Sequence, residues 1–217
     1  MKGKIKILCL ILFISKPLLC SYTTGNVILE WHSFRHAITV STGKDAGGLG
    51  HSFLKIKNNS NRTATIGHYA LSSGSDVTIG LWTSGVLGSS SSSDSSLSGF
   101  NEGILYNYEQ WYYCTYEKTQ DDIYTTYSMD ADDRNRLSDL LIKKNSNYSL
   151  ITYNFATFTT DAWNIVTGSD YWTGWNRTPS SVMSDIREYT YYNGNTSLNY
   201  SPYYYYYDEN KGTMVRV

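Results

Sequence analysis

HSFLKIKNNSNRTATIGHYAL, residues 51–71, is the stretch that decides the fold class of this chain. From His51 to Lys57 the side chains largely alternate in character, which is the two-residue period of a strand with one buried face. Turn-forming residues follow at 58–61, and a second strand-like run spans Thr63–Leu71. The pattern predicts an antiparallel hairpin made of residues 51–57 and 63–71.

The strand pattern continues along the chain and then gives way to a helical one. Further strands are predicted at residues 76–82, 103–117 and 122–127, the last of them paired with 103–117. Apolar spacing and capping residues predict three helices, over residues 131–144 after Asp130, from Phe155 after Asn154, and from Pro179 after Thr178. Strands followed by helices predict an α+β fold, with an antiparallel sheet from the N-terminal half packed against helices from the C-terminal half.

The first twenty residues have the composition of a secretory signal peptide. Three lysines precede the apolar run Ile7–Ile14, which is short for a bilayer span, and cleavage is expected after Cys20. A transmembrane anchor is the alternative, and a lipid anchor at Cys20 is a weaker one. We therefore expect a secreted protein, extracellular or periplasmic, with one domain at 21–195, a tyrosine-rich tail at 196–217 and no transmembrane segment in the mature chain. The tail itself has no clear element.

Charge and cysteine content exclude several classes of protein. The net charge is −1 at pH 7, and without a basic surplus we expect no nucleic-acid partner. Of the three cysteines, only Cys114 lies beyond the predicted signal peptide, so a disulfide framework is not expected. We interpret Cys114 as a packed thiol in a strand, and we expect a monomer.

The four histidines offer one candidate site. His32 and His36 have helical metal-site spacing, but Ala37–Val40 has strand character, and in a strand the two rings would lie about 13 Å apart. We therefore expect no metal and no cofactor. His51 begins one predicted strand and His68 lies late in the next, so the hairpin predicts that they converge, where they could act as a general base and its orienting partner. The alternative is that both are ordinary strand histidines.

Short motifs around these histidines resemble the circularly permuted papain-like hydrolases. They are Gly50-His51-Ser52-Phe53, Ile66-Gly67-His68-Tyr69, and Asn154-Phe155-Ala156-Thr157-Phe158 leading to Ala162-Trp163-Asn164. That superfamily includes permuted NlpC-type peptidases and lecithin:retinol acyltransferase-like enzymes. The resemblance covers roughly residues 47–189. It implies a strand histidine as base (His51), a second polar residue on the next strand (His68) and a nucleophilic cysteine at the start of a later helix.

The nucleophile position of this pattern holds Phe155. A phenyl ring has no lone pair with which to attack a carbonyl group, so cysteine–histidine chemistry is not possible there. The hydroxyl of Thr157 lies two residues further along the helix, about 200° around its axis.

Three functions follow as hypotheses. The first is a catalytically inactive papain-like protein that binds a peptide, glycan or acyl ligand in the former active-site cleft. The second is an active cysteine-type peptidase, amidase or acyltransferase relative that uses another nucleophile. The third is a structural or adhesive surface module that uses its tyrosine-rich tail as a contact surface.

Overall fold

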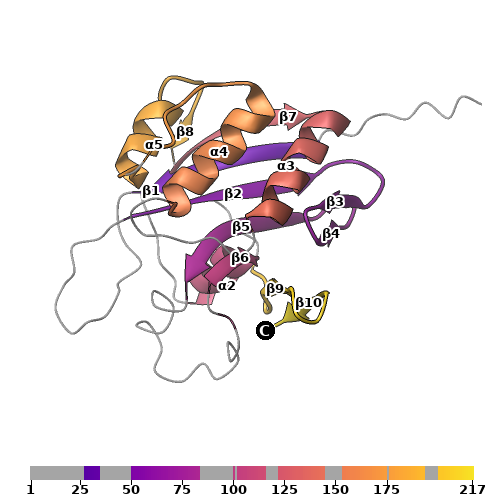
Figure 1. The fold of residues 1–217 in the computed structure, drawn as a ribbon. Helices are drawn as coiled ribbons and strands as arrows, with labels where there is room; N and C mark the ends of the chain where they lie inside the picture. The colour runs from indigo at the N-terminus through magenta and orange to yellow at the C-terminus, as the bar shows by residue number, and fades with distance from the viewer. Residues whose placement is uncertain are drawn as a thin grey trace, which may run out of the picture.

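One antiparallel sheet organises the chain. The computed structural model describes residues 27–34, 50–83, 100, 102–115, 122–144, 153–174, 176–193 and 200–217. Within these residues the main sheet has eight strands in the order β10-β9-β6-β5-β2-β1-β7-β8, and β3 and β4 form a separate two-stranded sheet (Figure 1). The strands are β1 (Val27–Phe34), β2 (His51–Asn58), β3 (Ala64–Ile66), β4 (Tyr69–Leu71), β5 (Asp76–Thr83), β6 (Glu102–Tyr106), β7 (Asp122–Met129), β8 (Tyr192–Asn193), β9 (Tyr205–Asp208) and β10 (Thr213–Arg216).

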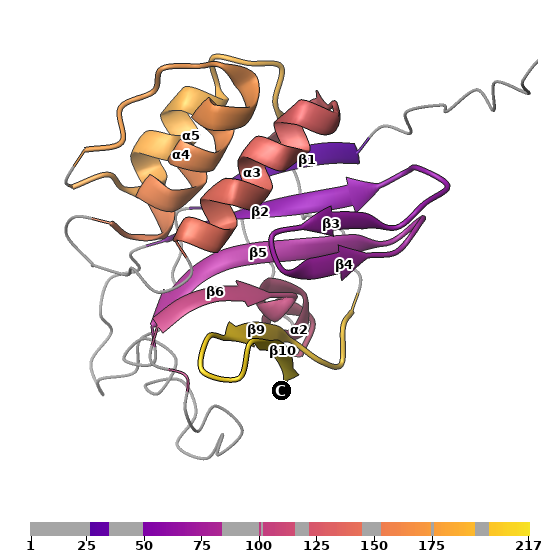
Figure 2. The ribbon, with the colours of Figure 1, turned by 45° about the vertical axis from the view of Figure 1, so that its right-hand side comes forward.

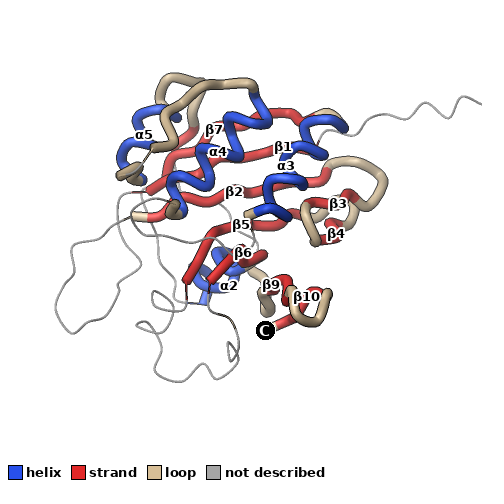
Figure 3. Tube along the Cα trace, viewed as in Figure 1, coloured by secondary structure: helices blue, strands red, loops and turns tan. Residues whose placement is uncertain are grey.

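Three helices cover one face of this sheet, and a fourth packs on the other. Helices α3 (Ala131–Lys143), α4 (Phe155–Thr167) and α5 (Pro179–Ile186) lie together over strands β1, β2, β5 and β7 (Figures 1 and 2). Helix α2 (Tyr108–Thr115) directly follows β6 and packs against β5. The α+β prediction is confirmed, and Figure 3 shows the helices and strands as separate layers.

Alternation along the strands divides the buried residues between two clusters. On β2, Leu54 and Ile56 face the cluster under α3, α4 and α5, whereas Phe53 faces a second cluster under α2. The second cluster also receives Tyr204 and Tyr206 from the C-terminal segment. Because side chains alternate between the faces of a strand, this sheet buries apolar residues on both of its faces.

The helix predictions succeed where capping chemistry marks the start of a helix. Asp130 caps α3 in a reciprocal capping box, Asn154 caps α4 and Thr178 caps α5 with Pro179 in its first turn. The sequence predicts an apolar stripe on α4 made of Phe155, Phe158, Ala162 and Ile165. The last of these is wrong, because Ile165 is exposed.

Four strand predictions need correction. Residues 103–117 do not form one long strand: β6 ends at Tyr106, Asn107 adopts a left-handed conformation with φ of 64°, and α2 begins at Tyr108. Strand β7 pairs with β1 instead of that segment. Residues 63–71 do not pair with β2, whose neighbours are β1 and β5; they fold on themselves as β3 and β4. The tail supplies β9 and β10, so residues 205–216 belong to the sheet.

Several sequence predictions lie outside the described residues. They are the signal peptide at 1–20, the strand at Ala37–Val40 with the preceding His36, and the side chain of Cys114, whose backbone belongs to α2 and not to a strand. Among the residues that the structure describes, none of the helices has the length and apolar character needed to span a bilayer.

Candidate functional site: a buried histidine–glutamate pair at the start of helix α4

A buried imidazole and a buried carboxylate form the centre of the site. His51 is the first residue of β2, and its Nε2 lies 3.1 Å from Oε1 of Glu109, with both side chains fully inaccessible to solvent. The indole Nε1 of Trp82 donates to the same Oε1 at 3.0 Å. A carboxylate without solvent is costly unless it is hydrogen-bonded or paired, so His51 and Trp82 are the groups that allow Glu109 to be buried.

The neighbouring strands and α2 set the geometry of this pair. Trp82 on β5 lies beside His51, with the two ring centroids 4.4 Å apart. Glu109 enters from the first turn of α2, which the left-handed residue Asn107 places directly after β6. Gly80 makes room for the carboxylate, because a Cβ atom at this position would overlap Glu109 Oε1 and Trp82 Nε1. A glycine is therefore part of the site.

The first residue of α4 faces the histidine. The Phe155 ring contacts the His51 ring edge-on, with centroids 5.0 Å apart. Asn154 fixes the start of the helix by accepting hydrogen bonds from the backbone N–H groups of Ala156 and Thr157, at 2.8 and 3.1 Å. The predicted helix start at Phe155 is confirmed, and its first residue faces His51, whereas the second histidine expected at this helix start, His68, stacks on Tyr207.

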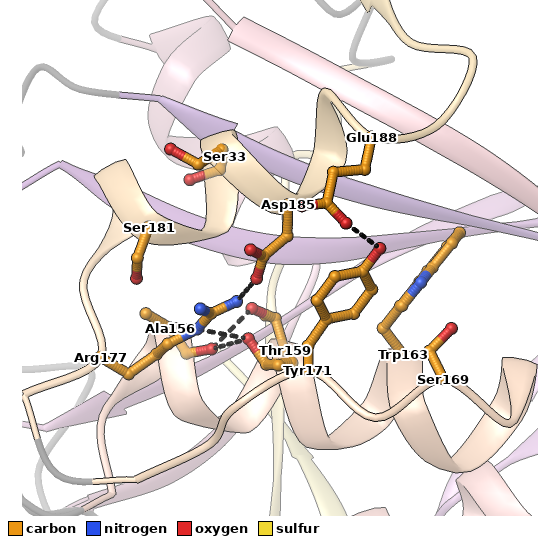
Figure 4. A network of polar contacts seen from close by, with 12 residues as sticks. Ser33, Ala156, Thr159, Trp163, Ser169, Tyr171, Arg177, Ser181, Asp185 and Glu188 are labelled. Atoms are coloured by element: carbon orange, nitrogen blue, oxygen red, sulfur yellow. Dashed lines mark hydrogen bonds and ion pairs between the residues drawn. The ribbon is translucent and has the colours of Figure 1, made fainter.

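A buried arginine ties this helix start to α5 (Figure 4). Arg177 forms an ion pair with Asp185 and donates from Nε to Thr160 Oγ1 at 3.1 Å. Its backbone carbonyl accepts from Nδ2 of the capping residue Asn154 at 3.0 Å. The segment before α5 and the first turns of α4 are thereby held together, which fixes the position of residue 155.

His68 does not join His51. It lies in the turn between β3 and β4, where its ring stacks on Tyr207 of β9 with centroids 3.5 Å apart. Strand β9 is three strands away from β2, which corresponds to about 14 Å at the usual spacing. Burial lowers the pKa of His68, although Glu209 opposes that shift. The expected convergence fails because residues 63–71 turn back on themselves instead of pairing with β2.

Glu109 therefore holds the position beside the histidine that the sequence assigns to His68. Sequence reasoning misses it because residues 103–117 are predicted as a strand, in which a lone glutamate is an ordinary surface residue. One residue in the sequence could have indicated that the strand ends before Glu109. Asn107 is of a type that tolerates a left-handed backbone and so can end a strand.

The site has the parts of a general base but no attacking group among the described side chains that surround it. Ser33 and Ser52 are buried, but their hydroxyls are 2.8 Å apart and Ser33 donates to the Pro179 carbonyl at 2.9 Å. Ser52 also follows His51 on the strand and so points to the opposite face of the sheet. Thr157 Oγ1 is buried, and its position two residues along the helix places it about 200° around the helix axis from residue 155.

Comparison with family models, curated proteins and solved structures finds no significant match to this chain. Within the described residues, no three His, Cys, Asp or Glu side chains gather closely enough to hold a metal ion.

A second polar cluster lies beside the site on β1 and β2. Glu30 Oε2 lies 3.0 Å from His32 Nε2 and 3.4 Å from Lys55 Nζ, and Lys55 also approaches Asp76 at 3.7 Å. Burial alone would raise the pKa of Glu30, but His32 and Lys55 favour the carboxylate and hold the pKa below its ordinary value of 4.5.

This cluster predicts an acid-dependent contribution to stability. A carboxyl group with a lowered pKa stabilises the fold above its unfolded-state pKa, and the contribution is lost as the pH falls through the folded-state pKa. We expect Glu30→Gln to reduce the free energy of unfolding by about 1 kcal/mol at pH 7, and the difference from wild type to shrink below pH 4.5. Urea unfolding between pH 7 and pH 3 measures this difference. Glu102→Gln, at an exposed position on β6, should change little, and a constant effect of Glu30→Gln across this range would contradict the prediction.

Proposed function

We propose that this chain is a secreted, catalytically inactive protein of the papain-like hydrolase type, which acts as a monomer and binds a peptide, glycan or acyl ligand at the His51 end of the sheet. The observation that carries the proposal is the contact between Phe155 and His51. It places the residue at the predicted nucleophile position against a histidine that a buried carboxylate holds.

The geometry supports the inactive form over an active one. In a cysteine–histidine hydrolase the imidazole takes the proton of a thiol at a helix N-terminus, and a third polar group orients the ring. Here His51 and Glu109 supply the base and the orienting group, and α4 supplies the helix N-terminus. Phe155 supplies no nucleophile, and the hydroxyls of Ser33 and Ser52 are engaged with each other.

The surroundings of the pair favour a ligand with apolar groups. The rings of Phe53, Trp82 and Phe155 all lie within 6.0 Å of the His51 ring, measured between centroids. Phe155 is only half-buried, so its exposed part is the accessible portion of this aromatic group. The rings of His51, Phe53 and Trp82 are buried, so a ligand would contact this group through Phe155.

The adhesive-module hypothesis receives less support from the tail. Tyr204 and Tyr206 are buried in the second cluster, and β9 and β10 extend the sheet. These two tyrosines contribute to the core, whereas Tyr200 and Tyr203 of the same tail are exposed.

Binding and turnover assays on the unmodified chain test the proposed function. Three fluorescent probes represent the ligand classes: a short peptide, a chito-oligosaccharide and an N-acyl amino acid with a twelve-carbon chain. We expect one of them to bind wild type, binding to weaken at least about tenfold in Phe155→Ser, and no hydrolysis of peptide, amide or ester substrates.

Ile165→Ser is the matched control, because it replaces an exposed apolar residue of the same helix far from His51. Equal binding by both variants, or turnover by wild type that survives Cys114→Ser, would contradict the proposal.

A further inference from the structure

The acceptor motif for N-linked glycans, N-x-S/T, occurs at several places in this chain. The motifs begin at Asn58, Asn61, Asn147, Asn176, Asn195 and Asn199. A chain rich in Asn, Ser and Thr produces such motifs by chance, so the motif alone selects no site. The fold adds a second criterion, because a bulky glycan is compatible only with an asparagine side chain that faces solvent. Asn147, Asn195 and Asn199 lie outside the described residues.

The side chain of Asn58 holds the turn after β2 together. Asn58 is fully buried, and its Nδ2 donates to the carbonyls of Arg62, Leu71 and Ser72 at 2.7, 3.0 and 3.2 Å. Its Oδ1 accepts from the N–H and the hydroxyl of Ser60, at 3.1 and 2.6 Å. A glycan on Nδ2 would break the bonds that close this turn, so a chain glycosylated at Asn58 cannot adopt the structure.

The same turn presents Asn61 to solvent. All three residues of its motif, Asn61, Arg62 and Thr63, are exposed. The carbonyl of Arg62 accepts from Asn58 Nδ2 and also from Ser60 Oγ, at 2.9 Å. The backbone of the turn is thus fixed around an exposed Asn61, and a glycan on this residue displaces none of the contacts that form the turn.

Asn176 meets the criterion less well. Its own side chain is exposed, but the next residue, Arg177, is buried and paired with Asp185. The hydroxyl of Thr178 accepts from the N–H of Ser181 at 3.3 Å as the cap of α5. The motif requires the hydroxyl residue as well as the asparagine, so the fold favours Asn61 over Asn176.

We propose that Asn61 carries an N-linked oligosaccharide in the secreted protein. The proposal rests on the secretion that forms part of the proposed function, and not on ligand binding at His51. The donor is a lipid-pyrophosphate-linked oligosaccharide of the host secretory pathway. Nδ2 of Asn61 forms a bond to the anomeric carbon of the sugar and loses one proton, while the bond from that carbon to the pyrophosphate oxygen breaks and the lipid pyrophosphate leaves with the bonding electrons.

The glycan would lie at the opposite end of β2 from His51. His51 begins the strand and Asn58 ends it, which separates them by about 23 Å in an extended strand. The loop between β2 and β3 lies at the Asn58 end of the sheet (Figure 2). A glycan at Asn61 therefore leaves the start of β2 uncovered.

Peptide mapping of the full chain, made in cultured human cells, tests this proposal. A host signal peptide precedes residue 1, and its removal shows that the chain has entered the secretory pathway. Protein recovered from medium and cells is treated with the amidase that releases N-linked glycans and converts the carrier asparagine to aspartate. We expect aspartate at position 61 in most molecules, loss of that glycan in Asn61→Gln and Thr63→Ala, and its retention in Thr63→Ser.

Ser60→Ala is the matched control, because it removes the hydroxyl of the overlapping Asn58 motif and keeps the Asn61 motif, so the glycan at Asn61 should remain. Thermal unfolding shows that each variant is folded. Unmodified Asn61 in folded protein that has entered the pathway, or a glycan on Asn58 in folded protein, would overturn the proposal. The chain without the added signal peptide tests secretion separately: if that form alone stays in the cells without a glycan, the proposed secretion fails while Asn61 stands as the acceptor.

Discussion

Gly80→Ala is expected to destabilise the protein by about 3 kcal/mol, although it adds only one methyl group. The new Cβ would occupy the space of Glu109 Oε1 and Trp82 Nε1, so the carboxylate must leave its position beside His51. Overpacking a buried site and breaking a buried charged hydrogen bond each cost a few kcal/mol. Urea unfolding at pH 7 measures the loss.

The double variant Gly80→Ala/Glu109→Ala separates this clash from a general intolerance of strand β5 to alanine. Removing the carboxylate relieves the closer of the two overlaps and leaves the one with Trp82 Nε1, so the double variant should lose at least about 1 kcal/mol less than the sum of the single variants. Strict additivity would contradict the account of Gly80 as the residue that makes room for Glu109.

Phe155→Cys is expected to produce a thiol with a pKa below 7, compared with about 8.5 for an ordinary cysteine. The side chain would sit at the first residue of α4, where the helix N-terminus favours a negative charge, and next to His51. The substitution removes a half-buried ring and should cost at most about 3 kcal/mol. Titration of the thiolate absorbance near 240 nm, with Cys9, Cys20 and Cys114 replaced by serine, measures the pKa.

The parts of the fold that sequence predicts correctly are those specified by local chemistry. Strands β2 and β5 follow from their alternating side chains, and α3, α4 and α5 follow from Asp130, Asn154 and Thr178 as caps. A side-chain cap acts within three residues along the chain, so the sequence itself shows both partners of the hydrogen bond.

The parts that sequence misses depend on partners distant in the chain. Helix α2 has a weak apolar stripe and is stabilised by packing of Tyr108 and Tyr112 against Trp82, Phe53 and the C-terminal segment. The tail strands form because β6 offers an edge to Tyr205 and Tyr206. Neither contact has a local signal, since tertiary packing overrides propensity in short elements.

For the candidate site, too, the sequence predicts the residues that have a local signal and misses those that depend on distant partners. His51 and Phe155 are found from short motifs, and the structure places them in contact. His68 is assigned from an assumed hairpin, and the assignment fails because β2 pairs with β5 across residues 59–75. Glu109 is missed because burial of a carboxylate is understood only when His51, Trp82 and Gly80 are seen around it.

The pH dependence of alkylation by iodoacetamide tests the central claim most directly, namely that His51 and the start of α4 form a cysteine–histidine site that lacks its cysteine. The measurement compares Phe155→Cys with Phe155→Cys/His51→Ala between pH 5 and pH 9, in the same serine background, with thermal unfolding to show that both are folded. We predict rapid alkylation below pH 7 in the variant that retains His51, and at least about tenfold slower alkylation at pH 6 without it. Identical profiles for both variants, each with a midpoint near pH 8.5, would contradict the claim.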